Sequence, residues 1–291
     1  MSRRVRGLAG ALAGLLALAW AGAALALPPV WIVRDKDSEI VLFGSIHVLP
    51  PGLDWQPPVL AQALKHADDL WFELPIDGQS QVETANLAIQ AGSLPPAQSL
   101  FRMLPAADSA LMAKVAQDYG ISPVLLDRLR PWLAEITVSA GVYRRAGADA
   151  GSGVEQTLAA TATQAEHKAF ETPAEQIAIL AQGSDAEQVA SLGETLHELV
   201  DTPDEYKTLV AAWMAGDMKA LDREAVAPLR AASPALFKRL VTDRNIRWTR
   251  VLDERMKGHG LTVVVVGVGH LIGPGGVPAR LRALGYSVVG P

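Results

Sequence analysis

The sequence predicts an α/β fold in which strands from both ends of the chain form one central sheet, with a large helical segment between them. Short apolar runs rich in β-branched residues occur before residue 75 and after residue 260, whereas helical periodicity dominates the middle. Near the start, strand, helix and strand follow one another, which is the order of a βαβ unit with parallel pairing. The sheet is therefore expected to be mixed but mainly parallel.

The first 26 residues have the pattern of a secretory signal peptide. Three arginines precede an uncharged run, residues 8–25, and Ala-Leu-Ala at 24–26 supplies the small residues of a cleavage site. We expect cleavage after Ala26 and export to the periplasm or out of the cell. An uncleaved membrane anchor is the alternative, because the apolar run approaches the length of a membrane span. The cleavage triplet and the two prolines after it favour removal.

The rest of the chain, residues 27–291, is expected to form one domain with its helical middle at about 80–257. Without the three arginines of the leader, 23 basic residues face 31 acidic ones, and the net charge of −8 argues against nucleic-acid binding. No second long apolar run follows, so we expect no stable membrane span after cleavage. Cysteine is absent, which excludes disulfides, thiolate nucleophiles and thiolate metal sites.

The elements at the two ends are predicted from apolar runs and turn residues. In chain order they are a hairpin over 31–43, a helix within 53–68, a strand over 69–74, a strand over 261–266, a helix over 276–283 and a strand over 286–289. Proline and glycine divide the middle into several helices. One short apolar run, residues 168–171, predicts a further strand there.

Two histidines stand in the same local context, each directly after a predicted strand and three residues after a glycine. They end the motifs Gly44-Ser-Ile-His47 and Gly267-Val-Gly-His270. Ligands bind at the carboxyl ends of parallel strands, and glycine there allows a sharp turn and a close approach. We therefore expect His47 and His270 to face one crevice. The alternative is that each is a polar residue at a strand end, satisfied by the backbone.

Two glutamates, Glu73 and Glu171, also end predicted strands. Imidazole and carboxylate ligands together suit zinc, manganese, iron or cobalt. The same groups suit a metal-free general base. We take His47, His270, Glu73 and Glu171 as candidate metal ligands, and His47 and Glu73 also as candidate catalytic groups. For each glutamate, a solvated strand end is the alternative.

Arg244 is a further candidate catalytic residue, on a predicted helix where it shares a face with Trp248. Its guanidinium could reach a substrate carbonyl or carboxylate. The competing structural interpretation, which the residues alone favour, is a salt bridge with Asp243 or Asp253.

Other motifs that carry chemistry are not supported. His197-Glu-Leu-Val-Asp201 resembles the zinc-peptidase helix His-Glu-x-x-His, but the second ligand is an aspartate and Pro203 follows closely. The chain has no Gly-x-Ser-x-Gly motif, so a serine mechanism of the α/β-hydrolase type is unsupported. It also has no phosphate-binding glycine motif.

Three motifs, in this order, carry a resemblance to a known family: Gly44-Ser-Ile-His47 with Val-Leu-Pro after it, Trp71-Phe-Glu-Leu74, and Val266-Gly-Val-Gly-His-Leu271. With them the chain resembles the TraB/GumN family, which includes the pheromone-shutdown proteins and the Tiki proteases. Further matching motifs are Gly153-Val-Glu-Gln156, Phe170-Glu-Thr172, Ala212-Trp-Met-Ala-Gly-Asp217 and Asp243-Arg-Asn-Ile-Arg-Trp248. The resemblance spans the chain from about Val30 to Pro291.

The resemblance implies a fold like that of the erythromycin-esterase and haem-binding ChaN relatives. In the Tiki branch it implies a metal-dependent peptidase that uses the two histidines and a glutamate. By position these are His47, His270 and Glu73, while Glu171 and Arg244 match other characteristic positions. The expected ion is manganese, cobalt or zinc, and the expected substrate a peptide or small molecule. A non-catalytic protein that binds such a ligand, and a metal-free esterase-like hydrolase with His47 as general base, stay open as alternatives.

Overall fold

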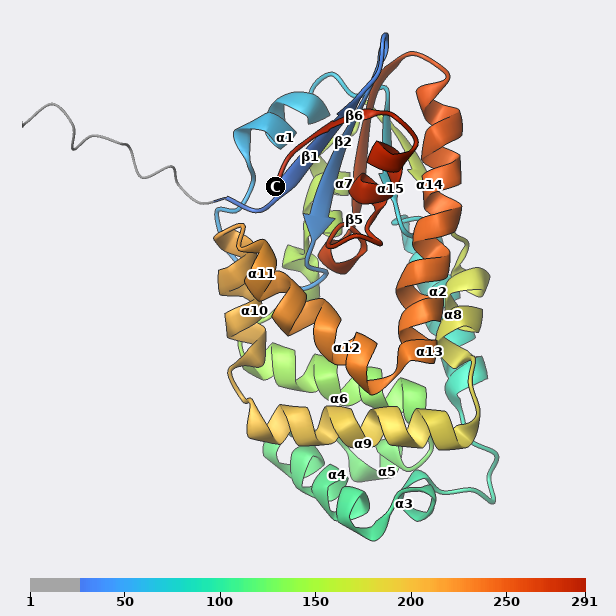
Figure 1. The fold of residues 1–291 in the computed structure, drawn as a ribbon. Helices are drawn as coiled ribbons and strands as arrows, with labels where there is room; N and C mark the ends of the chain where they lie inside the picture. The colour runs from blue at the N-terminus through green and yellow to red at the C-terminus, as the bar shows by residue number, and fades with distance from the viewer. Residues whose placement is uncertain (1–26) are drawn as a thin grey trace, which may run out of the picture.

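The computed structural model describes residues 27–291, and the predicted signal peptide, residues 1–26, lies outside them. A six-stranded sheet has the order β4-β3-β5-β2-β1-β6 (Figure 1). Its strands are β1 (Val30–Arg34), β2 (Ser38–Ser45), β3 (Asp69–Phe72), β4 (Glu166–Ala169), β5 (Gly260–Gly267) and β6 (Ser287–Val289). The first four strands in that order pair in parallel, and β1 and β6 are added antiparallel. The predicted mixed, mainly parallel sheet is confirmed.

The two Gly-x-x-His motifs leave neighbouring strands at the same edge of the sheet. Strands β2 and β5 are parallel, with Gly44 opposite Val266 and Ser45 opposite Gly267. Both strands are buried along most of their length, as expected for the centre of a parallel sheet covered on both faces. The strand order therefore brings the two ends of the chain together where the histidines follow.

A helical segment of the chain lies between β3 and β5, interrupted only by β4. The helices of the described chain are α1 (Pro58–Leu64), α2 (Gly78–Gly92), α3 (Leu100–Met103), α4 (Ala106–Tyr119), α5 (Pro123–Leu126), α6 (Pro131–Arg145), α7 (Val154–Thr161), α8 (Pro173–Ala181), α9 (Asp185–Asp201), α10 (Glu205–Met214), α11 (Met218–Leu221), α12 (Ala227–Ala232), α13 (Pro234–Phe237), α14 (Asp243–Met256) and α15 (Val277–Ala283). Short 3-10 segments lie at Ala150–Ser152 and Val268–His270, and π-helical segments at Asp222–Val226 and Lys238–Thr242. The predicted large helical insertion is confirmed.

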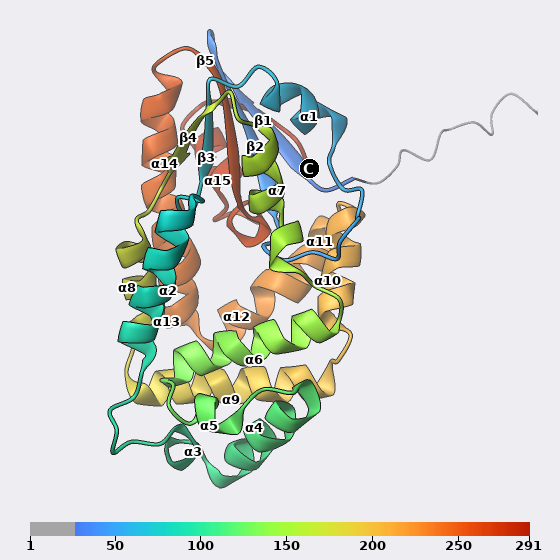
Figure 2. The same ribbon diagram turned by 180° about the vertical axis from the view of Figure 1, so that it is seen from behind.

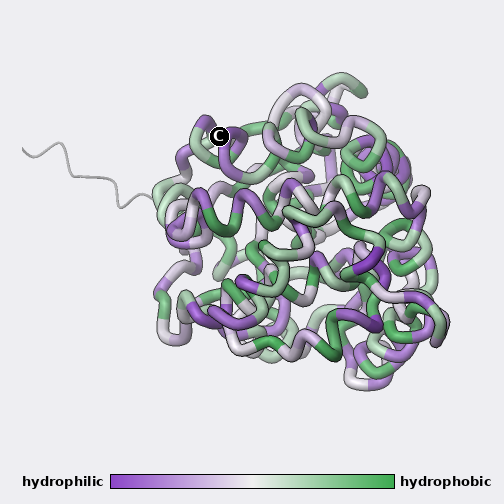
Figure 3. Tube along the Cα trace, turned by 90° about the horizontal axis from the view of Figure 1, so that it is seen from below, coloured by the Kyte–Doolittle hydropathy of each residue, from purple (hydrophilic) through white to green (hydrophobic). Residues whose placement is uncertain are grey.

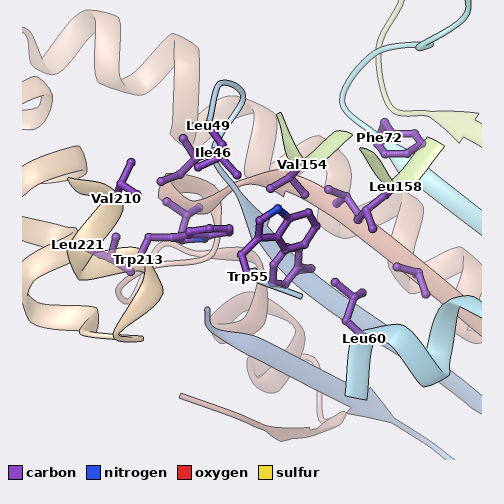
Figure 4. Close-up of a cluster of buried hydrophobic side chains, with 14 of the residues drawn as sticks. Ile46, Leu49, Trp55, Leu60, Phe72, Val154, Leu158, Val210, Trp213 and Leu221 are labelled. Atoms are coloured by element: carbon purple, nitrogen blue, oxygen red, sulfur yellow. The ribbon is translucent and has the colours of Figure 1, made fainter. Parts of the chain in front are cut away.

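The two faces of the sheet belong to different hydrophobic clusters, because side chains alternate along each strand. On one face Phe43 and Val265 pack with residues of α1, α7 and α10, part of which is shown in Figure 4. On the other face Leu42 and Val264 pack with α14 and α15. A third cluster joins α3, α4, α5, α6 and α9, which lie at the end of the molecule away from the sheet in Figures 1 and 2.

Hydrophobic and hydrophilic residues alternate along much of the tube in Figure 3, as expected for helices with one buried face. Two predicted strands have other bounds in the structure: the strand expected at 69–74 ends at Phe72, and the strand expected at 168–171 lies at 166–169. The first residues of β4 have exposed polar side chains at the edge of the sheet, so an apolar run in the sequence does not reveal them. Within residues 27–291 no helix has both the length and the apolar character that a membrane crossing requires.

Candidate functional site

The loop that carries His47 is held by α10 of the helical segment. The indole Nε1 of Trp213 donates to the carbonyl oxygen of Gly44 at 2.7 Å. The hydroxyl of Tyr206 donates to the carbonyl oxygen of Val48 at 3.1 Å. Trp213 lies beside this loop in Figure 4, and its ring is tilted against the buried rings of Phe43 and Trp55. Because both carbonyl groups are fixed on either side of His47, the loop has little freedom to move.

Helix α7 approaches the same loop from the other side. A Cβ atom on Gly153 would lie 2.0 Å from the carbonyl oxygen of His47, so this position requires glycine. Two residues later, the Glu155 carboxylate accepts a hydrogen bond from Nδ1 of His47 at 2.8 Å. The hydroxyl of the buried Ser45 donates to the same carboxylate oxygen. Glu155 therefore fixes both the tautomer and the orientation of the imidazole.

This pairing changes the protonation of both groups. The Glu155 carboxylate raises the pKa of His47 to about 9. Burial acts to raise the pKa of Glu155, but the His47 charge and hydrogen bond outweigh it and hold that pKa below its usual value. The side chain of His47 is 64% exposed, and Glu155 is the one hydrogen-bond partner that its ring has among residues 27–291. Its Nε2 atom is therefore free to meet a substrate or a water molecule.

Glu73 follows β3 directly and is buried at the end of the sheet. One carboxylate oxygen, Oε1, accepts from the backbone N–H of Gly267 at 2.7 Å, and Oε2 accepts from Nη2 of Arg244 at 2.6 Å. Burial acts to raise the pKa of Glu73, but the charges of His270, Arg244 and His47 outweigh it and lower the pKa to about 2. Glu73 is an anion across the physiological range of pH.

His270 has both ring nitrogens engaged. Its Nδ1 lies 2.7 Å from Oδ1 of Asn245, and its Nε2 lies 3.2 Å from Nη1 of Arg244. The amide nitrogen of Asn245 donates to the carbonyl oxygens of His270 and Gly275, so its oxygen must face the imidazole. Since a guanidinium can only donate, Nε2 accepts and Nδ1 carries the proton. Burial lowers the pKa of His270 to about 4, so the ring is neutral.

Arg244 and Glu171 form the buried base of the site. Nε and Nη2 of Arg244 donate to the Glu171 carboxylate at 2.9 and 2.8 Å. Glu171 also accepts from Arg247 at 3.0 Å and from the indole N–H of Trp248 at 3.1 Å. Both Glu171 oxygens are thus in use, and Arg244 holds two acids and an imidazole together.

The salt bridge predicted for Arg244 with Asp243 or Asp253 is wrong. Asp243 pairs with Lys238 at 2.7 Å, and Asp253 accepts from the hydroxyl of Tyr286 at 2.7 Å. The reason is helical geometry: Arg244 lies on the buried face of α14, which turns its side chain toward the end of the sheet.

His47, Glu73 and His270 meet around Gly267. A Cβ atom at this glycine would lie 3.2 Å from Oε1 of Glu73, 3.5 Å from Nε2 of His47 and 3.8 Å from Cδ2 of His270. Nε2 of His270 also lies 3.8 Å from Oε1 of Glu73. Three of the four predicted metal ligands therefore lie around Gly267, where His270 presents a ring carbon, while Glu171 lies behind Arg244.

The contacts of Arg244 limit what these donors can do. Its guanidinium uses the Nε2 lone pair of His270, which a metal ion would need, and it also occupies Oε2 of Glu73, while the N–H of Gly267 occupies Oε1. Across residues 27–291, no group of three or more His, Asp or Glu has the arrangement of a metal site. Metal binding stays a prediction, and it requires Arg244 to withdraw from His270.

A cleft of about 480 Å³ opens beside His47, Glu73 and Glu155. The segment after β3, helices α2 and α8 and the start of α7 form its walls, and α2 and α8 lie side by side in Figure 2. This volume lies within the range of small-molecule and cofactor sites, roughly 300–1,000 Å³.

Three residues of the site had no assigned role in the sequence analysis: Ser45, Glu155 and Asn245. Each lies inside a motif that matches the family, but the motifs do not show which partner a side chain meets. Ser45 and Glu155 are 110 residues apart in the chain. Asn245 comes directly after Arg244, and its contact with His270 depends on how α14 packs against the end of β5.

Comparison with known proteins gives one family and two relatives. The sequence model of the TraB/PrgY/gumN family matches residues 29–289. "Uncharacterized protein YbaP" of Escherichia coli (strain K12) is 27% identical over 258 residues, which cover 88% of this chain and 92% of the relative. The protein of the same name from Shigella flexneri is also 27% identical over 258 residues, with the same coverage. No solved structure matches the chain significantly.

Proposed function

The chain belongs to the TraB/PrgY/gumN family, and on this premise we propose that its crevice hydrolyses a peptide bond or a related acyl bond, with His47 as the base that activates water. The observation that carries the proposal is the pair of His47 and Glu155 at the mouth of the cleft. An imidazole fixed at Nδ1 by a carboxylate and free at Nε2 is the arrangement that general-base catalysis needs.

In the proposed reaction, neutral His47 takes a proton from water at Nε2 while the water oxygen attacks the carbonyl carbon. The imidazolium then gives this proton to the leaving nitrogen or oxygen as the bond to the carbonyl carbon breaks. Glu155 stabilises the imidazolium, and Ser45 holds Glu155 in place. Ser45 and Glu155 act through His47 and are positioning residues.

Arg244 and Glu73 have a different proposed role from His47. Arg244 is buried and engaged by Glu73, Glu171 and His270, so we assign it to positioning rather than to contact with substrate. The Glu73 carboxylate accepts from the backbone N–H of Gly267 and so holds this turn in place. Its negative charge near His47 favours the imidazolium that forms during the reaction.

A divalent metal ion is the second candidate for activating water, favoured by the nearness of Glu73 Oε1 and His47 Nε2 at Gly267 and by His270 Nε2, 3.8 Å from the same Glu73 oxygen. His47 Nε2, Glu73 Oε1 and His270 Nε2 would hold manganese, cobalt or zinc once Arg244 had left His270. When bound, such an ion lowers the pKa of its water ligand and polarises a carbonyl group.

The proposed place of action is outside the cytoplasm, because the first 26 residues have the pattern of a secretory leader. The partner is then a peptide or small molecule of the periplasm or the surroundings. Fractionation of cells that express the full chain tests this: we expect a processed protein that begins at Leu27. An unprocessed protein in the cytoplasm would contradict it.

The test of the proposed activity is a screen of purified residues 27–291 against a mixture of peptides and aryl esters, read by mass spectrometry. One sample contains a chelator, a second contains added Mn²⁺, and bound metal is measured in both. Cleavage that resists the chelator supports His47 as base, and cleavage restored by Mn²⁺ supports the metal. Retention of a ligand without cleavage in either sample would contradict hydrolysis and leave a binding protein.

A further inference from the structure

Apart from the catalytic groups, the cleft beside His47 is lined by uncharged side chains. Beyond the catalytic groups, seven of its lining residues are apolar, namely Phe72, Leu74, Pro75, Ile76, Ala85, Ala88 and Ala150. The remaining lining residues are Gln81, Thr84, Gln156 and Gln176. The cleft thus combines apolar surface with amide and hydroxyl groups, and it touches the proposed base directly.

No free charge is available in this cleft for a charged ligand group. Of the residues that line it in the described chain, three are titratable: His47, Glu73 and Glu155. His47 and Glu155 neutralise each other, and Glu73 is neutralised by Arg244. A carboxylate or ammonium that entered the far part of the cleft would lose its water without gaining a partner.

Helix α2 sets the width of the cleft. Ala85 and Ala88 are three residues apart, so they lie on one face of the helix, and both line the cleft. The 15 residues of α2 include one charged residue, Glu83, which is not among the lining residues. Larger side chains at Ala85 or Ala88 would fill the space that the substrate takes.

The glutamines differ in how much of their hydrogen bonding is already satisfied. Gln81 donates to the carbonyl oxygen of Ile76 at 2.7 Å. By contrast, the half-buried side chains of Gln156 and Gln176 have no hydrogen-bond partner among residues 27–291. A carboxamide offers both donors and an acceptor, which is what the backbone of a bound peptide can pair with.

We propose that this cleft selects an uncharged group of the substrate, that Gln156 and Gln176 bind the polar backbone next to that group, and that Ala85 and Ala88 limit its size. The proposal rests on the proposed function, because it takes the cleft as the substrate site of the same hydrolase. Selectivity comes from the cost of leaving a charged group unpaired, which discriminates more strongly than a change in apolar contact.

The experiment measures binding rather than turnover, so it stands apart from the hydrolysis assay. The protein is residues 27–291 with His47→Ala and Glu155→Gln, which cannot consume the ligand by the proposed route and leaves no unpaired carboxylate of this pair in the cleft. The probes are fluorescent acetyl-Ala-X-Ala-Ala amides with X as Ala, Val, Gln, Glu or Lys, followed by fluorescence anisotropy. We expect the three neutral peptides to bind on the order of ten-fold more tightly than the Glu and Lys peptides.

Two further substitutions in the same background make the test specific. Gln176→Lys should bring the affinity of the Glu peptide close to that of the neutral peptides, whereas Gln90→Lys, which adds the same charge on the exposed part of α2, should leave it unchanged. Ala88→Leu should weaken the Val peptide more than the Ala peptide.

Equal affinity for neutral and charged peptides, no binding of any peptide, or equal effects of Gln176→Lys and Gln90→Lys would each overturn the proposal. Selective binding by a chain that cleaves nothing would support the selectivity of the cleft and contradict the proposed hydrolysis. Equal binding of neutral and charged peptides by a protein that hydrolyses a substrate would contradict the selectivity of the cleft and support the proposed hydrolysis.

Discussion

Nη2 of Arg244 donates to Oε2 of Glu73 at 2.6 Å, although the two residues are 171 positions apart and come from the last long helix and an early strand. The same guanidinium pairs with Glu171 and with Nε2 of His270. One cation therefore joins the N-terminal strands, the helical segment and the C-terminal motif at the point where the proposed chemistry takes place.

The first prediction concerns the stability that this cation supplies. Arg244→Met should lower the free energy of unfolding by about 3–5 kcal/mol, because two buried carboxylates lose their partner. Arg247→Met is the matched control, since Arg247 pairs with the same Glu171 but has a 48% exposed side chain. It should cost no more than about 1 kcal/mol. Urea unfolding of both variants checks this, and equal losses would contradict it.

The second prediction concerns the space around Gly267. Gly267→Ala should reduce hydrolysis about ten-fold, because the added methyl group would lie 3.2 Å from Oε1 of Glu73, which must shift, and would take up space beside Nε2 of His47. Gly78→Ala serves as control, since a Cβ atom there meets open space. The hydrolysis rates of both variants are measured on a substrate that the screen has identified. Full activity of the Gly267→Ala protein would exclude a reaction at this point.

The third prediction concerns the proton on His270. In the metal-free chain, Asn245 accepts from Nδ1 and Arg244 donates to Nε2, so the neutral ring should be the Nδ1–H tautomer. Nitrogen-15 NMR of labelled histidine distinguishes the two tautomers. Asn245→Leu should mix them, since the acceptor that selects Nδ1–H is lost. An Nε2–H ring in the unsubstituted protein would contradict the hydrogen bonds described for this site.

The fourth prediction concerns pH. His47 must be neutral to act as a base, and Glu155 raises its pKa to about 9, so the rate of hydrolysis should rise from pH 6, reach half its maximum near pH 9 and level off above that pH. Glu155→Gln removes the carboxylate that favours the charged ring, so the profile should shift to lower pH. Glu166→Gln, at an exposed position in β4, should leave it unchanged. An identical profile in the Glu155→Gln and unsubstituted proteins would exclude His47 as the titrating base.

The sheet and the positions of the two histidines could be predicted because their evidence is local. Apolar runs identify β2 and β5, and a Gly-x-x-His motif follows each, so the crevice at their ends follows from the rule for parallel strands. Glu73 could be predicted for the same reason, as the residue directly after β3.

The partners within the site could not be predicted, because they depend on how distant helices pack. Glu155 begins α7 and reaches His47 only because Gly153 lets that helix approach the loop. Glu171 follows a strand, as predicted, but it faces α14 and binds Arg244 there. No pattern in the sequence around Glu155 or Glu171 shows which distant side chain each glutamate contacts.

The most direct test of the account is the rate of hydrolysis by residues 27–291 with His47→Ala, compared with His66→Ala at an exposed position outside the cleft. The His47→Ala protein should lose at least about a hundred-fold in rate, as expected when a general base is removed. The His66→Ala protein should keep full activity and the stability of the parent, and the His47→Ala protein should remain folded at the assay temperature despite the loss of its pair with Glu155. Cleavage by the His47→Ala protein at the parent rate would contradict a reaction centred on His47.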